Sequence, residues 1–498
     1  MRTLLVTGIA AAMTTAALAA DTPDYSLTVY SSAQPGQVST ESLANFGNAL
    51  PGYALVRDGR KMTLQAGSGV LRFTDVATRI DPTTVAFESL TDPAGTRVVE
   101  QNYQFDLVNR DKLLERYVGA NITVEQQRGD ALERLSGVLL SAADGTLILQ
   151  RDSGEVVSIN SYSNVLFPSL PGGLITRPTL VWLVNAKQAG THDTRVSYQT
   201  QGMTWWSDYN ITLRENDGGC DMDLSAWVTI VNQSGASYPQ AQLKLVAGEV
   251  NRAPAAPQPA MRMQMKTMAA AAPAMEDGFQ ESSLFEYHLY TLGRRSDLPD
   301  NSTKQLELFP TASKAGCTKQ LVFTASPQPW AYWSSPIQDQ GYGATNEGTV
   351  GAFLEFDNKE ANKLGMPLPA GRVRVNQTSV DGTLEFIGED VIKHTPRNET
   401  LRIKLGTAFD VVGERKQVSF TVDTTAKTID ESFEVTVRNR KKTAARVIAR
   451  EYLYRWSGWT VTAKNRDFVK RDANTIDFPL DIPADGEAKI TYTVRYKW

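Results

Sequence analysis

Apolar residues at every second position, repeated in short segments along most of the chain, are the strongest constraint on its fold. The last segment is an example, since Ile490, Tyr492, Val494 and Tyr496 alternate with threonines and basic residues. Successive side chains of a strand point to opposite faces of a sheet, so this alternation predicts strands with one buried and one solvated face. We therefore expect a mostly β fold that contains several β-sandwich, immunoglobulin-like domains and a few short helices.

The chain is too long for one hydrophobic core. It has 498 residues, whereas single cores stop growing at about 250 to 300 residues. Changes in residue pattern predict five parts: a signal peptide at 1–20, an N-terminal β-sandwich domain at 21–117, a small barrel-like β module at 118–185, a central β-sandwich domain at 186–340 with a mobile Met-, Ala- and Pro-rich insert at 251–283, and a C-terminal β-sandwich domain at 341–498.

Local sequence signals place one helix and two hairpins. Asn109 can cap a helix that Gly119 can end. Asp144-Gly145, between two apolar segments, supplies the positive φ angles of a tight hairpin turn, and the residues 152–154 (Asp-Ser-Gly) predict a second turn.

The N-terminal residues have the pattern of an export signal. Arg2 precedes an apolar stretch, and the small residues that follow predict cleavage near Ala19 or Ala20. We expect a periplasmic or extracellular protein of the cell envelope, with no transmembrane helix in the mature chain. Loss of Arg2 changes the formal charge from −4 to −5, and a mildly acidic chain without a basic cluster is not expected to bind nucleic acid.

Cys220 and Cys317 are the two cysteines of the chain. Exported proteins fold where thiols oxidise, so we expect a disulfide between them. Two separately buried thiols are the alternative. Both cysteines follow a glycine, and we expect each to lie just after a turn between strands.

Four motifs together resemble a known bacterial family. They are GMTWWSDYN (Gly202 to Asn210), LSAWVTIVNQSG (Leu224 to Gly235), LFEYHLYTL with LPDNSTKQLELF, and LGMPLPAGRVRV (Leu364 to Val375). These motifs are similar to the domain-of-unknown-function family numbered four-one-three-nine, whose relatives include mucoidy inhibitors. The likeness covers roughly Val184 to Trp498, with a further similarity over Tyr25 to Tyr117. It implies a link to capsule or exopolysaccharide physiology and assigns no catalytic residue.

One aromatic cluster is a candidate ligand-binding site. Trp330, Tyr332 and Trp333 stand between prolines, where a loop can present flat rings to the C–H faces of sugars. The alternative is that these rings anchor the loop to the core. Trp205, Trp206, Tyr209 and Trp227 lie in strand-like segments, and we expect them to pack in the core or at sheet edges.

A methionine cluster in the insert is a candidate metal site. Thioethers are soft ligands that select Cu(I), and Met261, Met263, Met265 and Met268 lie close together in the sequence. The alternative is a flexible tether with adaptable apolar side chains. We expect no bound cofactor.

Hydrolysis is the main alternative to binding. No G-x-S-x-G or H-E-x-x-H motif occurs, and His192, His288 and His394 are far apart in the sequence. Asp208 is the first of the 55 acidic residues to examine, with a hydrogen-bonding role as the alternative. The sequence favours a non-enzymatic envelope protein that binds or scaffolds a polymer or another protein, over a hydrolase of envelope glycan or a copper-binding protein.

Overall fold

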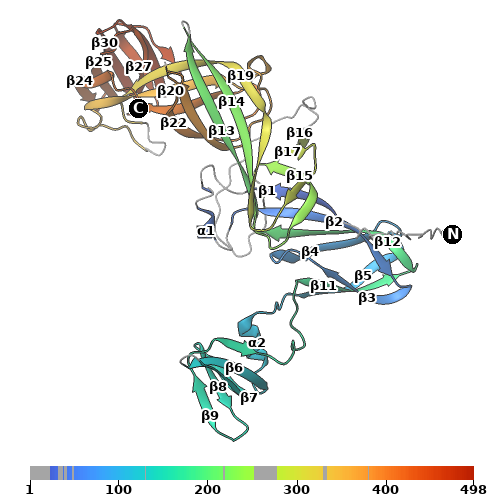
Figure 1. Ribbon diagram of the computed structural model, residues 1–498. Coiled ribbons are helices and arrows are strands. Elements are labelled where there is room, and N and C mark those ends of the chain that lie inside the picture. Colours follow the sequence, from blue (N-terminus) through green and yellow to red (C-terminus); the bar gives the residue numbers. More distant parts are fainter. Residues whose placement is uncertain are drawn as a thin grey trace, which may run out of the picture.

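The computed structural model confirms a mostly β chain (Figure 1). It describes residues 23–31, 37–38, 42–46, 50–128, 131–216, 219–248, 250–251, 278–328, 334–379 and 381–498. Helical structure in these ranges is limited to α1 (Leu43–Phe46), α2 (Arg110–Arg116) and the 3-10 turn η2 (Glu360–Asn362). Among the described residues, no helix has the length and apolar composition needed to span a bilayer.

Two sheets join strands from distant parts of the chain. The eight-stranded sheet has the order β16 (Phe279–Leu284), β17 (Tyr287–Leu292), β15 (Tyr238–Ala247), β1 (Asp24–Tyr30), β2 (Tyr53–Leu64), β12 (Gly190–Gln201) and β4 (Ile80–Ser89), with β18 (Ser296–Leu298) paired to β15. The three-stranded sheet has the order β3 (Gly67–Thr74), β11 (Thr179–Ala186) and β5 (Thr96–Gln104). Strands near the N-terminus therefore complete sheets with strands from 179–292.

The largest sheet system contains fourteen strands in the described residues. Its main path is β22 (Leu384–Ile392), β21 (Gly371–Thr378), β13 (Met203–Asn216), β14 (Gly219–Asn232), β19 (Ser302–Thr324), β20 (Thr345–Asp357), β24 (Val411–Asp423), β25 (Thr428–Asn439), β30 (Glu487–Lys497) and β27 (Trp459–Lys464). The remaining strands are β23 (Thr400–Thr407), which pairs with β20; β26 (Ala445–Tyr452), which pairs with β19 and β29 (Thr475–Ile482); and β28 (Val469–Lys470), which pairs with β29.

A five-stranded module extends from the rest of the molecule (Figure 1). Its order is β10 (Asn164–Leu166), β6 (Asn121–Arg128), β7 (Ala131–Ala143), β8 (Thr146–Gln150) and β9 (Val156–Ile159). The two chain segments that lead to it pair with each other, since Val108 N donates to Ile175 O at 2.9 Å and Ile175 N donates to Asp106 O at 3.0 Å.

The local predictions in this module are confirmed. Asn109 Oδ1 accepts a hydrogen bond from Lys112 N and caps α2. Asp144 and Gly145 have φ angles of 52° and 78° and connect β7 to β8, as the turn chemistry requires.

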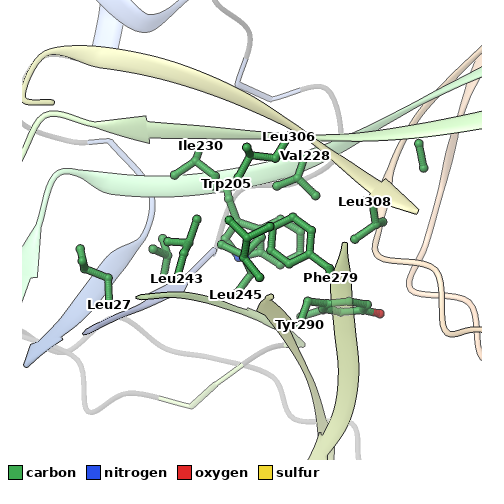
Figure 2. Packing of buried hydrophobic residues seen from close by; sticks show 14 of the residues in the cluster. Leu27, Trp205, Val228, Ile230, Leu243, Leu245, Phe279, Tyr290, Leu306 and Leu308 are labelled. Atoms are coloured by element: carbon green, nitrogen blue, oxygen red, sulfur yellow. The ribbon is translucent and has the colours of Figure 1, made fainter. Parts of the chain in front are cut away.

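The central core lies between two facing sheets. Figure 2 shows Trp205, Val228 and Leu306 of the β13, β14 and β19 sheet packed toward Leu27, Leu245 and Tyr290 of the β1, β15 and β17 sheet. Full burial of one such large apolar side chain contributes about 1.5 to 3 kcal/mol. A second cluster fills the C-terminal strands and includes Phe433 and Ile490.

The predicted disulfide joins Cys220 and Cys317. The two residues are direct cross-strand partners of β14 and β19, so the prediction that Cys317 follows a turn is wrong. Glycine signalled a turn there, but the chain continues as one strand with bulges. In the chain-entropy model, closing a ring over a separation of 97 residues stabilises the fold by about 4 to 5 kcal/mol.

The prediction that the mobile insert at 251–283 extends to residue 283 is wrong. Most of it lies outside the described residues, but Phe279–Leu284 form β16 and pair with β17. Phe279 is buried in the central core. The sequence did not predict this strand because the residues from Gln280 to Ser283 are all polar and show no apolar alternation.

Candidate functional site

A broad sheet surface is the best candidate site. On β13, β14 and β21 the buried residues alternate with side chains that point away from the central core. We call this surface, together with the adjoining side of β22, the outer face; it consists of Trp206, Asp208, Asn210, Thr212, Ser225, Trp227, Arg372, Arg374, Asn376, Leu384, Phe386 and Glu389.

Strand register fixes the arrangement of the outer face. Asp208 of β13 lies opposite Trp227 of β14 on one side and Arg372 of β21 on the other. The next row contains Asn210, with Ser225 and Arg374 as its neighbours. Because neighbouring strands are about 4.8 Å apart, these rows place polar and aromatic groups side by side on one surface.

Asp208 is held by hydrogen bonding and charge. Its Oδ2 accepts a hydrogen bond from Trp206 Nε1 at 2.8 Å. Its Oδ1 lies 3.6 Å from Arg374 Nη1 and 4.0 Å from Arg372 Nε. Asp208, the acidic residue that the sequence singled out, therefore lies on the outer face. Its carboxylate orients the neighbouring side chains there.

Trp227 is an exposed aromatic ring on β14. Its exposed fraction is 39%, whereas Trp205 and Tyr209 are buried as predicted. The prediction that Trp227 packs in the core or at an edge is wrong, because the strand turns this side chain to the uncovered face. Large aromatic residues at exposed sites are suited to binding, since they offer apolar area at little conformational cost.

Phe386 is a second exposed ring on the outer face. It lies on the edge strand β22, opposite Asn376, and its exposed fraction is 61%. Leu384, two residues earlier, is also exposed. Amide and hydroxyl groups of Asn210, Asn376 and Thr212 occupy the strands between the two rings.

One end of the outer face is covered. Val38, Leu50 and Val231 are buried together, and Trp206 packs against this small cluster. The uncovered part of the sheet therefore begins beside Trp206 and extends past Trp227.

Asp223 lies opposite Thr212, just beyond the outer face, and its carboxylate is kept ionised. Arg214 Nη2 donates a hydrogen bond to Asp223 Oδ1 at 2.5 Å, and Lys314 N donates to the same oxygen at 2.9 Å. These contacts hold the pKa of Asp223 below its usual value. A general acid needs a raised pKa, so Asp223 is unsuited to that role.

Two hollows among the described residues are small and open. One, of about 130 Å³, lies between charged side chains of β24, β25 and β30. The other, of about 110 Å³, lies beside the turn between β2 and β3. Both volumes are well below the roughly 300 to 1,000 Å³ of small-molecule sites.

The histidines occupy separate positions. Ser89 Oγ and His192 Nδ1 are 2.8 Å apart, but both residues are buried and His192 Nε2 lies 3.2 Å from Gln188 O. That contact assigns the ring proton to Nε2, so Ser89 donates to Nδ1. His288 pairs with Glu281, and His394 Nδ1 accepts from Ala370 N. The Ser89–His192 pair is therefore buried and fully hydrogen-bonded, as is typical of a pair with a structural role.

The other predicted sites lie outside the described residues. These are the candidate ligand-binding Trp330, Tyr332 and Trp333 and the candidate metal ligands Met261, Met263, Met265 and Met268. Within the part of the chain that the structure describes, no group of three or more His, Cys, Asp or Glu side chains is placed to hold a metal ion.

Comparisons with protein-family models, with curated proteins and with solved structures find no match to this chain. Membership of the family suggested by the sequence motifs stays a prediction.

Proposed function

We propose that this is an exported, non-enzymatic cell-envelope protein that binds an envelope polysaccharide on the outer face. The observation that carries the proposal is the exposed Trp227 ring, set in a polar sheet surface. The C–H face of a sugar stacks on an aromatic ring, while its hydroxyl groups need hydrogen-bonding neighbours. Asn210 and Ser225, in the row next to Trp227, supply such groups.

A binding role accounts for the site better than hydrolysis does. Ser89, which is hydrogen-bonded to His192, is buried with it, away from solvent. The pKa of Asp223 is lowered rather than raised. An open sheet surface supports recognition of a long polymer, because such a ligand needs no enclosing pocket.

The disulfide supports export. Disulfides persist in oxidising compartments and are rare in the cytosol, and Cys220 and Cys317 are joined. Together with the predicted signal at 1–20, it supports our proposal that the protein acts in the periplasm or outside the cell.

Affinity electrophoresis tests the proposal. The mature protein would be run through native gels that contain β-glucan, galactomannan or polygalacturonate. We expect retardation by at least one polymer, and we expect Trp227→Ala to weaken this binding about tenfold or more, which corresponds to about 1.4 kcal/mol.

Phe285→Ala is the matched control, because this ring is 85% exposed and lies in the turn between β16 and β17 of the eight-stranded sheet. It should migrate like the unchanged protein. Retardation by none of the three polymers, or equal retardation of the Trp227→Ala variant, would contradict the proposed function. Unchanged thermal unfolding of both variants would show that the fold is intact.

A further inference from the structure

The outer face carries a second ring at a distance that restricts the ligand further. Trp227 and Phe386 are separated by three strand spacings and by four residues along the strands. With about 4.8 Å between strands and about 3.3 Å per residue, the two positions are about 20 Å apart. No single sugar ring can contact both side chains.

The groups between the rings are suited to an uncharged chain. Asn210 and Arg374 are paired neighbours on β13 and β21, and they lie on the diagonal from Trp227 to Phe386. Asn376 and Thr212 form the next row. These amide, guanidinium and hydroxyl groups can donate hydrogen bonds to sugar hydroxyls along the whole path.

The charges of the outer face largely cancel one another. Arg374 lies between two carboxylates, 3.6 Å from Asp208 and 3.5 Å from Glu389. Arg372 is 4.0 Å from Asp208. Two arginines thus face two acids, and the exposed Glu307 lies opposite Trp227 on β19. A polyanion would meet no net positive field here and would compete with these pairs.

Resting on the function proposed above, we infer that the ligand is an uncharged glycan chain long enough to contact Trp227 and Phe386 at once. The Asn210–Arg374 row lies under the middle of this chain. The strand pairing from β14 to β22 holds both rings at a fixed spacing before the ligand arrives, which lowers the entropic cost of binding.

A chain-length series tests this inference. Fragments of the uncharged polysaccharide that retards the protein, either β-glucan or galactomannan, would be titrated by calorimetry, from the disaccharide upward. We expect affinity to rise with length until both rings are contacted, with a gain of about tenfold or more. Phe386→Ala should remove this gain, whereas Trp227→Ala should weaken fragments of every length.

The outcomes separate the two proposals. Trp227-dependent binding in which long and short fragments bind equally, or in which Phe386→Ala has no effect, would overturn the extended ligand and leave the proposed function standing. Trp227-dependent retardation by polygalacturonate alone would overturn the uncharged ligand in the same way. Phe409→Ala, at a residue that is 96% exposed, controls for loss of an exposed phenyl ring.

Discussion

Arg455 and Glu431 form a fully buried ion pair in the C-terminal cluster. Arg455 Nε donates to Glu431 Oε2 at 2.7 Å, and its Nη2 donates to Oε1 at 2.6 Å. The same guanidinium donates to the backbone oxygens of Ile337, Asp339 and Tyr342. One arginine therefore ties the segment 337–342 to the core while its charge is balanced by Glu431.

Loss of the buried charge at Glu431 should be costly. Glu431→Gln leaves Arg455 buried without its counter-ion, and we expect the free energy of unfolding to fall by about 3 to 5 kcal/mol. Urea denaturation would measure this change. Glu434→Gln is the control on the same strand, because its partner Lys489 is half exposed and the pair should contribute less than about 1 kcal/mol. Equal effects of the two substitutions would contradict the prediction.

At the scale of elements, three strands end in the same arrangement, in which the side chain of a buried asparagine hydrogen-bonds to two turns. We call this arrangement a clasp. Asn232 is the last residue of β14, Asn439 is the last residue of β25, and Asn358 directly follows β20. All three asparagines are buried. In each case the asparagine also contacts a second turn, which contains a proline. The strand after this proline turn pairs with the strand that ends at the asparagine: β19 with β14, β30 with β25, and β23 with β20.

The hydrogen bonds of the three clasps correspond. Each amide Nδ2 donates to a proline carbonyl: that of Pro299 for Asn232, of Pro483 for Asn439 and of Pro396 for Asn358. Each also donates to a carbonyl in the turn that follows its own strand. In return, each Oδ1 accepts a backbone N–H, from Ser234, Lys441 and Gly365 respectively. The side chain thus joins two turns that are far apart in the sequence.

Replacing a clasp asparagine should destabilise the protein strongly. Asn439→Ala leaves buried carbonyls without donors, and each unsatisfied group costs about 1 to 3 kcal/mol. We expect the free energy of unfolding to fall by about 2 to 4 kcal/mol, with a similar loss for Asn232→Ala. Thermal and urea unfolding would measure both. Asn121→Ala is the control, because Asn121 is exposed. A clasp variant as stable as Asn121→Ala would contradict the prediction.

At the scale of the whole molecule, buried tyrosines connect stability to pH. Burial raises the pKa of Tyr238 to about 12, and it also raises the pKa of Tyr198, Tyr290, Tyr492 and Tyr496 well above the usual value. These residues belong to both the central and the C-terminal clusters. A raised pKa in the folded state means that the folded protein keeps a proton that the unfolded chain releases.

Alkaline pH should therefore unfold the protein. The stability that Tyr238 contributes is complete below pH 10 and is lost as the pH rises through 12, because unfolding then releases a proton. The other four tyrosines act in the same direction, since burial also raises their pKa. For Tyr238 the rise of the pKa from 10 to about 12 corresponds to about 3 kcal/mol. We expect tyrosinate absorbance and loss of β circular dichroism to rise together in this range. Ionisation near pH 10 with the sheet signal intact would contradict the coupling.

Several features followed from the sequence because their causes are local. The alternating pattern determined the mostly β class, the Asp144-Gly145 pair determined a hairpin, and Asn109 determined the start of a helix. Each depends on the conformational preference of a few adjacent residues. The cysteine pairing also followed, since a chain with two cysteines can form one intramolecular bridge.

Only the tertiary structure decided which strand faces are left uncovered. Trp205 and Trp227 stand in similar strand patterns, yet the first is buried and the second is exposed. The difference arises because the β1, β15 and β17 sheet covers one side of β13 and β14, while the other side is open around Trp227. Alternation assigns residues to two faces, but pairing between distant strands decides which face meets another sheet, and the candidate site depends on that choice.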